Sequence, residues 1–146
     1  MEIREAREQD AVHLDNLLTM LIHDECQYDR TLDKNFVVKD FYINYIDDSS
    51  KFFRIVEVDD EIVGYLYGML IEDGILYAKL DALFIKEEYR NKGYAKELIE
   101  EFISWTKENN CEYAEVSVLK QNNTGKYLYS EMNFKEFKEI LRLDFK

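Results

Sequence analysis

A basic turn between an apolar run and a helix holds the residue types in this sequence that are best suited to chemistry. The turn runs from Arg90 to Ala95, and it follows the apolar residues Leu83, Phe84 and Ile85. The first N–H groups of a helix have no partner within it, and the helix dipole adds positive potential at that end. A glycine in the turn lets a ligand come close to the backbone. The pattern therefore predicts a binding site for phosphate or pyrophosphate.

The elements that position this turn follow from the hydrophobic pattern. Alternating and helical spacings predict the element order β-α-α-β-β-β-α-β-α-β, a mixed sheet of the α/β (α+β) class. We expect strands at 2–6, 51–58, 62–71, 75–85, 113–119 and 134–145, and helices at 10–26, 38–46, 93–109 and 122–133. The last strand is read either as one long strand or as a strand pair. The strand, turn, helix and strand from 75 to 119 form a right-handed crossover, so the two strands are expected to be parallel, with a ligand cleft at their carboxyl ends.

Composition and charge limit the classes of function. The chain has 19 basic and 31 acidic residues, for a net charge of −12. Proteins that bind nucleic acid or anionic membranes present a basic face, so neither partner is expected. The acidic excess suits a cationic substrate such as an amine, and it is equally explained by solubility alone. No apolar run is long enough to span a membrane, and the N-terminus lacks a signal-peptide pattern.

The length and the cysteines point to a simple organisation. A chain of 146 residues, 47% of them hydrophobic, is expected to form one domain over 1–146 with a proper core. Cys26 and Cys111 match no metal-ligand spacing and do not suggest a disulfide framework. We therefore expect a cytoplasmic protein without a metal site.

Four motifs in the right order resemble those of the GNAT superfamily of N-acetyltransferases, over nearly the whole chain. They are Ile3-Arg4-x-Ala6 followed by Asp10, then Leu83-x-Ile85 with Tyr89-Arg90-x-x-Gly93-x-Ala95, then Asn122 with Gly125, and Leu128-Tyr129-x-x-x-Asn133-Phe134. The chain departs from the family at Asn91 and Asn133, where glycine is usual, and at Gly125, where alanine is preferred. Asparagine is the next best residue after glycine for a left-handed backbone, so we expect positive φ at both positions.

The resemblance implies a fold, an activity and a set of site residues. The GNAT fold has a mixed sheet of about six or seven strands with helices on both faces. Its members transfer an acetyl group from acetyl-CoA directly to a primary amine in a ternary complex, here of a small molecule or peptide. By resemblance, the backbone of Leu83 to Ile85 holds the pantetheine arm, Asn122 bonds it from the facing helix, and Tyr129 is the general acid. The residues implied at the pyrophosphate are Arg90, Asn91, Lys92, Gly93, Tyr94 and Ala95.

Each of these roles has a plainer alternative. Arg90 and Lys92 could be solvated charges beyond a strand, and Tyr129 could be a core aromatic. Asn122 could cap a helix, which is compatible with a contact to CoA. Asp81 lies where some relatives carry an acid that takes the amine proton through water, although a solvated carboxylate fits equally.

The sequence indicates less about the amine acceptor and the oligomeric state. Asp24 and Glu25 could line the acceptor pocket, or could simply be the polar end of the first helix. The chain could also be a sensor that binds CoA or acyl-CoA without catalysis, or an interaction module that does not bind CoA. An aromatic C-terminal strand would suit a homodimer, by analogy with the fold.

Overall fold

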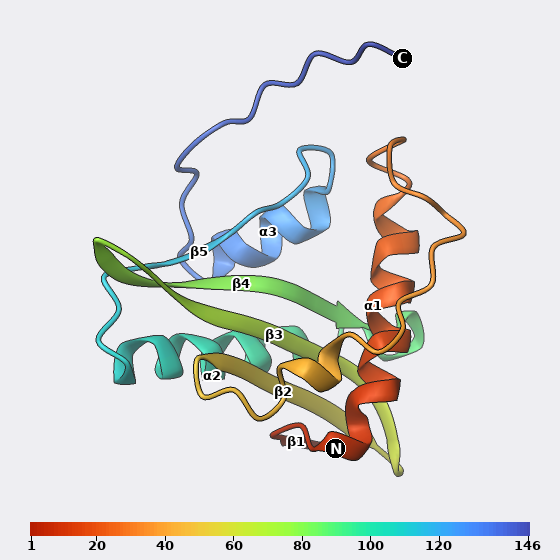
Figure 1. The fold of residues 1–146 in the computed structure, drawn as a ribbon, viewed down its shortest axis with the longest axis vertical. Helices are drawn as coiled ribbons and strands as arrows, with labels where there is room; N and C mark the ends of the chain where they lie inside the picture. Colours follow the sequence, from red (N-terminus) through yellow and green to blue (C-terminus); the bar gives the residue numbers. More distant parts are fainter.

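The computed structural model describes all 146 residues and contains one mixed sheet with three α-helices (Figure 1). The strands are β1 (Glu2–Arg4), β2 (Lys51–Val58), β3 (Glu61–Asp73), β4 (Ile75–Ile85) and β5 (Ala114–Val116). The helices are α1 (Ala11–Glu25), α2 (Tyr94–Glu108) and α3 (Asn123–Glu131). None of these helices is both long enough and apolar enough to cross a bilayer.

The strands lie in the sheet in chain order, from β1 to β5. Neighbouring strands from β1 to β4 are antiparallel, and β4 and β5 are parallel. The expected crossover through α2 is therefore confirmed. The Asp-Gly turn at 73–74 joins β3 to β4 with Gly74 at a φ of 77°, a backbone conformation that glycine adopts without strain.

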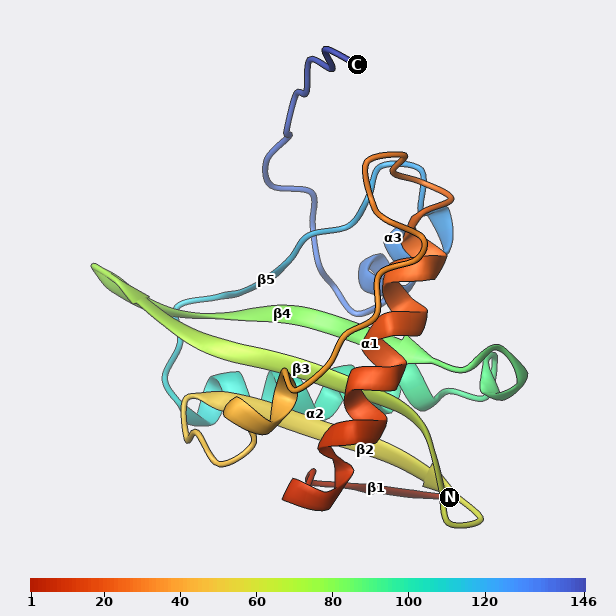
Figure 2. The same cartoon turned by 45° about the vertical axis from the view of Figure 1, so that its right-hand side comes forward.

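The sheet has a hydrophobic core on each face, with α1 covering one face and α2 the other (Figure 2). Leu98, Ile99 and Phe102 recur at helical spacing on α2 and are fully buried against the sheet. Leu14 and Leu17 of α1 are buried in the same way on the opposite face. Each such side chain contributes about 1.5–3 kcal/mol when it leaves water. The helical spacing in the sequence therefore translates directly into the position of both helices.

The expected helix over 38–46 is wrong, because the segment forms only a short 3₁₀ turn at Tyr42–Asn44. Asp40 has a φ of 52°, which an α-helix cannot contain. The buried carboxylate of Asp15 accepts hydrogen bonds from the N–H groups of Phe41 (3.4 Å) and Tyr42 (3.0 Å). A side chain of α1 thus replaces the helical hydrogen bonds of this segment and draws Tyr42 into the core.

The expected closing strand over 134–145 is also wrong, and the sheet has five strands rather than six or seven. The segment does alternate between apolar and charged residues, but a strand needs a neighbour to pair with. Residues 135–146, which we name the C-terminal arm, leave the body of the molecule without joining the sheet (Figure 1). β5 covers only three residues, compared with the seven expected over 113–119.

Asp10 stands at the N-cap of α1, as expected, but its side chain does not cap that helix. Its carboxylate accepts the backbone N–H of Arg7 (2.7 Å) and pairs with the guanidinium of Arg4 (2.9 Å). Both side chains of the Arg4–Asp10 pair are nearly buried, at 12% and 6% exposure. The nearly buried Arg4–Asp10 ion pair therefore links the first strand to the start of α1.

Candidate active site

β4 and β5 separate halfway along β4. Their parallel pairing ends where Leu80 lies opposite Val116, whereas β4 continues to Ile85. Beyond β5 the chain turns away from the sheet towards α3 (Figure 1). The last part of β4 therefore has a strand neighbour on one side only, and its other edge faces α3.

A bulge in β4 marks the point of separation. Leu80 and Ala82 lie opposite consecutive residues of β3, so Asp81 between them has no partner across the ladder. A bulge bends its strand and re-aims the side chains around it. The side chain of Asp81 is exposed. Asp81, singled out from the sequence, thus sits at the one irregular position of the strand.

The open edge of β4 presents unpaired backbone groups. The N–H of Lys86 donates to Val63 of β3 (2.8 Å). Backbone groups along a strand alternate between its two neighbours, so the N–H groups of Ile85 and Leu83 face away from β3. On that side they have no strand to pair with. An extended ligand could hydrogen-bond there as an added strand would.

The turn after β4 concentrates further unpaired N–H groups. Asn91 and Gly93 have positive φ of 63° and 85°, and the predicted positive φ of Asn133 is also confirmed, at 71°. The first backbone hydrogen bond of α2 runs from Glu97 to Gly93 (3.1 Å). None of the N–H groups from 91 to 96 donates to a protein acceptor. Alternating handedness in the turn makes a concave set of N–H groups that suits an anion.

Arg90 is placed differently from the sequence-based expectation. Its Nε donates to the carbonyl of Ile85 (2.7 Å), and its guanidinium pairs with Asp24 of α1 (3.0 Å) and lies over the ring of Phe84. The side chain therefore ties the turn to α1 instead of standing free beside the N–H groups. Lys92, by contrast, is exposed and makes no ion pair.

α3 lies on the side of β4 that β5 leaves open (Figure 1). Asn122 caps this helix, since its Oδ1 accepts the N–H of Gly125 (3.0 Å), which confirms the capping role. The cap leaves Nδ2 without a protein acceptor. At the other end of α3, Glu131 pairs with Lys96 in the first turn of α2 (2.9 Å). This ion pair fixes α3 beside the turn that carries the unpaired N–H groups.

Tyr129 is half-buried on α3 and packs against the core under α2. Its ring makes an edge contact with Phe134, with centroids 5.6 Å apart. Its hydroxyl forms no hydrogen bond within the protein. Burial, with the carboxylate of Glu25 nearby, raises the pKa of Tyr129 above its usual range, so the phenol stays protonated. A neutral phenol with no partner is able to donate its proton to a ligand.

Carboxylates and buried tyrosines come near one another where α1 packs over the sheet. Burial raises the pKa of Glu25 at the end of α1, and neighbouring carboxylates add to the shift. Those neighbours are Asp29, Asp24 and Asp81. The charge of Asp81 also helps to raise the pKa of three tyrosines of the α1-side core, Tyr42, Tyr65 and Tyr67, after burial as the main cause. A group of carboxylates beside aromatic rings is suited to a cationic ligand.

The sequence pattern did not favour Glu25 as a residue of the site. It is far from both Asp81 and Tyr129 in the chain, yet its charge acts on the pKa of Tyr129 and the charge of Asp81 acts on its own. Its position at the end of the first helix favoured the plainer interpretation of a polar helix end over a residue that lines the acceptor pocket. The packing of α1 over the sheet places the charge of Glu25 within electrostatic range of Asp81 and Tyr129.

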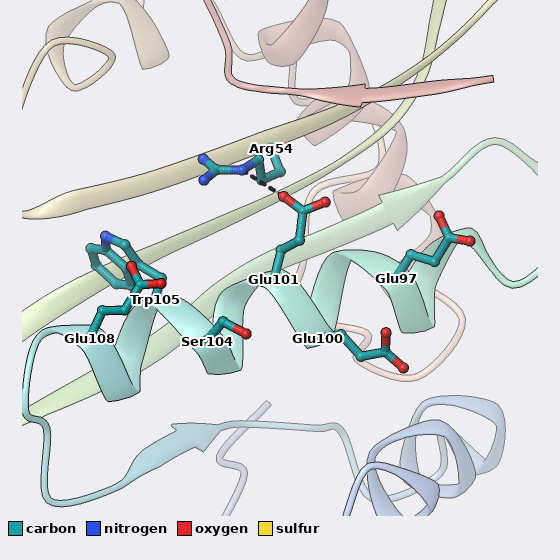
Figure 3. Close-up of a pocket in the computed structure, with 7 residues that line it drawn as sticks. All are labelled: Arg54, Glu97, Glu100, Glu101, Ser104, Trp105 and Glu108. Atoms are coloured by element: carbon teal, nitrogen blue, oxygen red, sulfur yellow. Dashed lines mark hydrogen bonds and ion pairs between the residues drawn. The ribbon is translucent and has the colours of Figure 1, made fainter.

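A surface hollow lies elsewhere. It has a volume of about 460 Å³ and runs along the outer face of α2, where Glu97, Glu100, Glu101 and Glu108 line it (Figure 3). Arg54 of β2 closes one side through its ion pair with Glu101 (2.8 Å). Glutamates at this spacing on a helix are typical of a solvated face. No group of three or more His, Cys, Asp or Glu side chains is arranged to hold a metal ion.

Comparison with known proteins places this fold among acetyltransferases. A mutant of the BH1408 protein from Bacillus halodurans is 17% identical, with a TM-score of 0.90 over 100% of both chains. An aminoglycoside N-acetyltransferase, AAC(6')-Iy, in complex with CoA is 15% identical, with a TM-score of 0.75 over 99% of both chains. A ribosomal-protein-alanine N-acetyltransferase from Brucella melitensis biovar Abortus is 19% identical, with a TM-score of 0.69 over 99% of this chain and 100% of that one.

These likenesses are to the fold, because the identities are low. Among curated proteins, none matches the chain in sequence. The sequence profile of the acetyltransferase (GNAT) family, however, matches residues 16–134, which contain α1 from Asn16 onward, the open edge of β4, the basic turn and α3. The chain therefore belongs to the GNAT family of acetyltransferases.

Proposed function

We propose that the protein moves an acetyl group from acetyl-CoA to a primary amine of a small molecule or peptide, within one catalytic domain spanning 1–146. The observation that carries this proposal is the open edge of β4, where Leu83 and Ile85 present unpaired N–H groups between the basic turn and Tyr129. An extended thioester substrate with a pyrophosphate at one end suits an open strand edge that leads into a turn of unpaired N–H groups.

The residues present fit CoA. The N–H groups from 91 to 96 would hold the pyrophosphate, with Lys92 free to add a positive charge. Gly93 adopts its φ of 85° without strain, and a Cβ there would meet no protein atom within 4 Å. The backbone of Leu83 and Ile85 would hold the pantetheine arm, and Nδ2 of Asn122 would bond it from α3. A bound thioester supplies an activated acetyl group and a thiolate leaving group.

The side chains around the open edge would then carry out the transfer. An N–H of the Leu83–Ile85 segment would donate to the carbonyl oxygen as the amine attacks, stabilising the developing negative charge. Tyr129 would give its proton to the departing sulfur. Asp81, directly or through water, would take the proton that the amine loses. Because both substrates are held together, no covalent enzyme intermediate is needed.

The acceptor that suits the site is a cationic amine. Glu25 and Asp81 place carboxylates beside the edge at which transfer would occur, and the chain carries a net charge of −12. The acceptors named for similar structures are aminoglycosides and a ribosomal protein alanine, and both are amines. The small carboxylate-lined surface favours a free polyamine or aminosugar over a neutral peptide.

The test is to incubate the protein with acetyl-CoA and with polyamines, aminosugars, amino acids and peptides in turn. Acetylated amine is measured by mass spectrometry, and CoA affinity by calorimetry. We expect acetylation to be fastest with amines that carry two or more positive charges. Tight CoA binding without acetylation of any class would instead favour a CoA sensor, and absence of CoA binding would favour an interaction module.

The cytoplasm is the location that we propose for this activity. Both cysteines are free thiols, as a reducing compartment would keep them.

A further inference from the structure

Arg90 lies at the start of the turn that would hold the pyrophosphate of CoA, but its side chain is bound to the rest of the protein. Its Nε donates to the carbonyl of Ile85 (2.7 Å), and its guanidinium pairs with Asp24 of α1 (3.0 Å). Its Cζ lies 5.3 Å from the centre of the ring of Phe84, which is 5% exposed in the core on the α1 side. Arg90 therefore connects β4 and the turn to the end of α1.

The carbonyl of Ile85 is a backbone group of the open edge of β4. Ile85 lies opposite Gly64, and the hydrogen bond beside this pair runs from the N–H of Lys86 to Val63. The N–H and C=O of one residue in an antiparallel strand point to the same side, so both groups of Ile85 face away from β3. Arg90 satisfies the carbonyl and leaves the N–H to a ligand. The guanidinium thus has a hydrogen-bonding role at this edge that requires no phosphate.

Asp24, the carboxylate that pairs with Arg90, directly precedes the residue of α1 that acts on the site. Glu25 is half-buried, and its charge adds to the burial that raises the pKa of Tyr129. A displacement of the last turn of α1 would move the carboxylate of Glu25 relative to Tyr129 and Asp81. A contact that fixes Asp24 therefore also fixes the position of an acidic side chain on the acceptor side.

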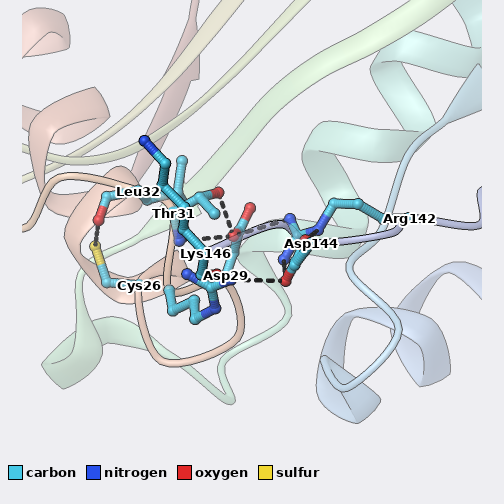
Figure 4. A network of polar contacts seen from close by, with 8 residues as sticks. Cys26, Asp29, Thr31, Leu32, Arg142, Asp144 and Lys146 are labelled. Atoms are coloured by element: carbon cyan, nitrogen blue, oxygen red, sulfur yellow. Dashed lines mark hydrogen bonds and ion pairs between the residues drawn. The ribbon is translucent and has the colours of Figure 1, made fainter.

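The loop that follows α1 is held by other contacts (Figure 4). Asp29 accepts the hydroxyl of Thr31 (2.6 Å) and pairs with Arg142 of the C-terminal arm (3.1 Å). Neither contact reaches the turn that follows β4. The Arg90–Asp24 ion pair is therefore the polar contact that joins the end of α1 to that turn.

We infer that Arg90 is a positioning residue that sets the affinity for the amine acceptor by holding the end of α1 against the turn. Because this role belongs to the proposed transfer, the inference rests on the proposed function. Arg90 and Asp24 are 41% and 49% exposed, and an isolated ion pair with that exposure contributes little. Here the carbonyl of Ile85 and the ring of Phe84 already orient the guanidinium, so less side-chain freedom is lost when the pair forms.

Two substitutions that remove opposite charges separate positioning from simple electrostatics. Asp24→Asn removes a negative charge from the acceptor side, and Arg90→Gln removes a positive one. If charge alone mattered, KM for a cationic amine would rise in the first variant and fall in the second. A positioning role predicts that both variants raise KM about threefold or more, while kcat changes less. It also predicts that the double variant is no worse than either single variant, because both remove the same contact.

CoA affinity and a matched ion pair provide the controls. Calorimetry should give Arg90→Gln a Kd for CoA within about threefold of the wild type, and Lys92→Gln a larger loss of affinity. Glu61→Gln removes the same charge as Asp24→Asn from an exposed ion pair with Lys86 (2.9 Å), and should leave KM for the amine within about twofold. Opposite changes of KM in the Asp24 and Arg90 variants overturn the inference. A greater loss of CoA affinity in Arg90→Gln than in Lys92→Gln overturns it as well.

Amide hydrogen exchange tests the same contact without any acetyl transfer. We expect Asp24→Asn and Arg90→Gln each to speed exchange of the amides from 21 to 26 about threefold or more, and Glu61→Gln to leave those rates unchanged. Because this measurement needs no acceptor, it separates the two proposals. A wild type that acetylates no amine refutes the proposed function, whereas unchanged exchange in both variants overturns the positioning role of Arg90.

Discussion

At the scale of single residues, the proposed transfer depends on three side chains that are distant in the sequence. Tyr129 lies on α3, Asp81 lies at the bulge of β4, and Glu25 ends α1. The motif spacing predicted Tyr129 and Asp81, because both sit at fixed distances from local signals. It could not select Glu25, since that choice depends on how α1 crosses the sheet.

Replacing Tyr129 by Phe tests the proton donor. The change keeps the ring and its contact with Phe134 but removes the hydroxyl, so we expect kcat to fall by about 10²–10⁴-fold while the Kd for CoA stays within about threefold. Tyr127→Phe is the control, because Tyr127 lies on the same helix and is 66% exposed. If Tyr129→Phe leaves kcat at the wild-type value, the assigned acid is wrong.

Replacing Glu25 by Gln tests the electrostatics of the α1 side. The pKa of Glu25 is raised in the folded protein from its ordinary 4.5, chiefly by burial. The folded protein therefore loses stability as the pH rises from 4.5 through the raised pKa of Glu25. Below pH 4.5 the carboxyl is protonated in both states and costs no stability. We expect Glu25→Gln to raise the melting temperature at pH 7 and to leave it unchanged at pH 4. The exposed Glu72→Gln should have no effect at either pH, and a destabilised Glu25→Gln at pH 7 would contradict the raised pKa.

At the scale of elements, the sequence predicted the strands whose bounds are set by local patterns. It failed for segments whose structure depends on a contact with another part of the fold. The bounds of β2 and β4 were predicted as observed, because their apolar runs end at turns with strong signals. The segment 38–46 has helical spacing, but a carboxylate of α1 takes its backbone hydrogen bonds. The arm has strand spacing but no neighbour in its own sheet. Neither outcome can be predicted from the intrinsic propensity of the residues, because each depends on contacts with other parts of the fold.

Two glycines with the same backbone conformation allow a matched test of the turn. Gly93 and Gly74 have φ of 85° and 77°, and a Cβ at either would meet no atom within 4 Å. Alanine should therefore cost a similar amount of stability at both, about 1–2 kcal/mol. Only Gly93 lies in the turn whose N–H groups would hold the pyrophosphate, so only Gly93→Ala should weaken CoA binding, by about tenfold or more. Calorimetry measures the affinity of both variants for CoA. An equal loss of affinity in the two variants would mean that the turn is not part of the CoA site.

At the scale of the whole molecule, the acidic balance should act on the rate at which cationic acceptors arrive. A chain with a net charge of −12 attracts polycations over a distance set by the ionic strength. We expect kcat/KM for a polyamine to fall about tenfold or more between 20 mM and 500 mM salt, and kcat to change little. A primary amine with a single charge serves as the control acceptor. A salt response equal for both acceptors would mean that the acidic charge serves only solubility.

The proposed function rests on the open edge of β4 as the binding site of CoA. Amide hydrogen exchange with and without CoA tests that assignment most directly. We predict that CoA slows exchange at Leu83 and Ile85 together with the amides from 91 to 96, and leaves the amides from 97 to 108 unaffected. Slowed exchange at 97–108 or at the C-terminal arm, with Leu83 and Ile85 unchanged, would contradict this prediction.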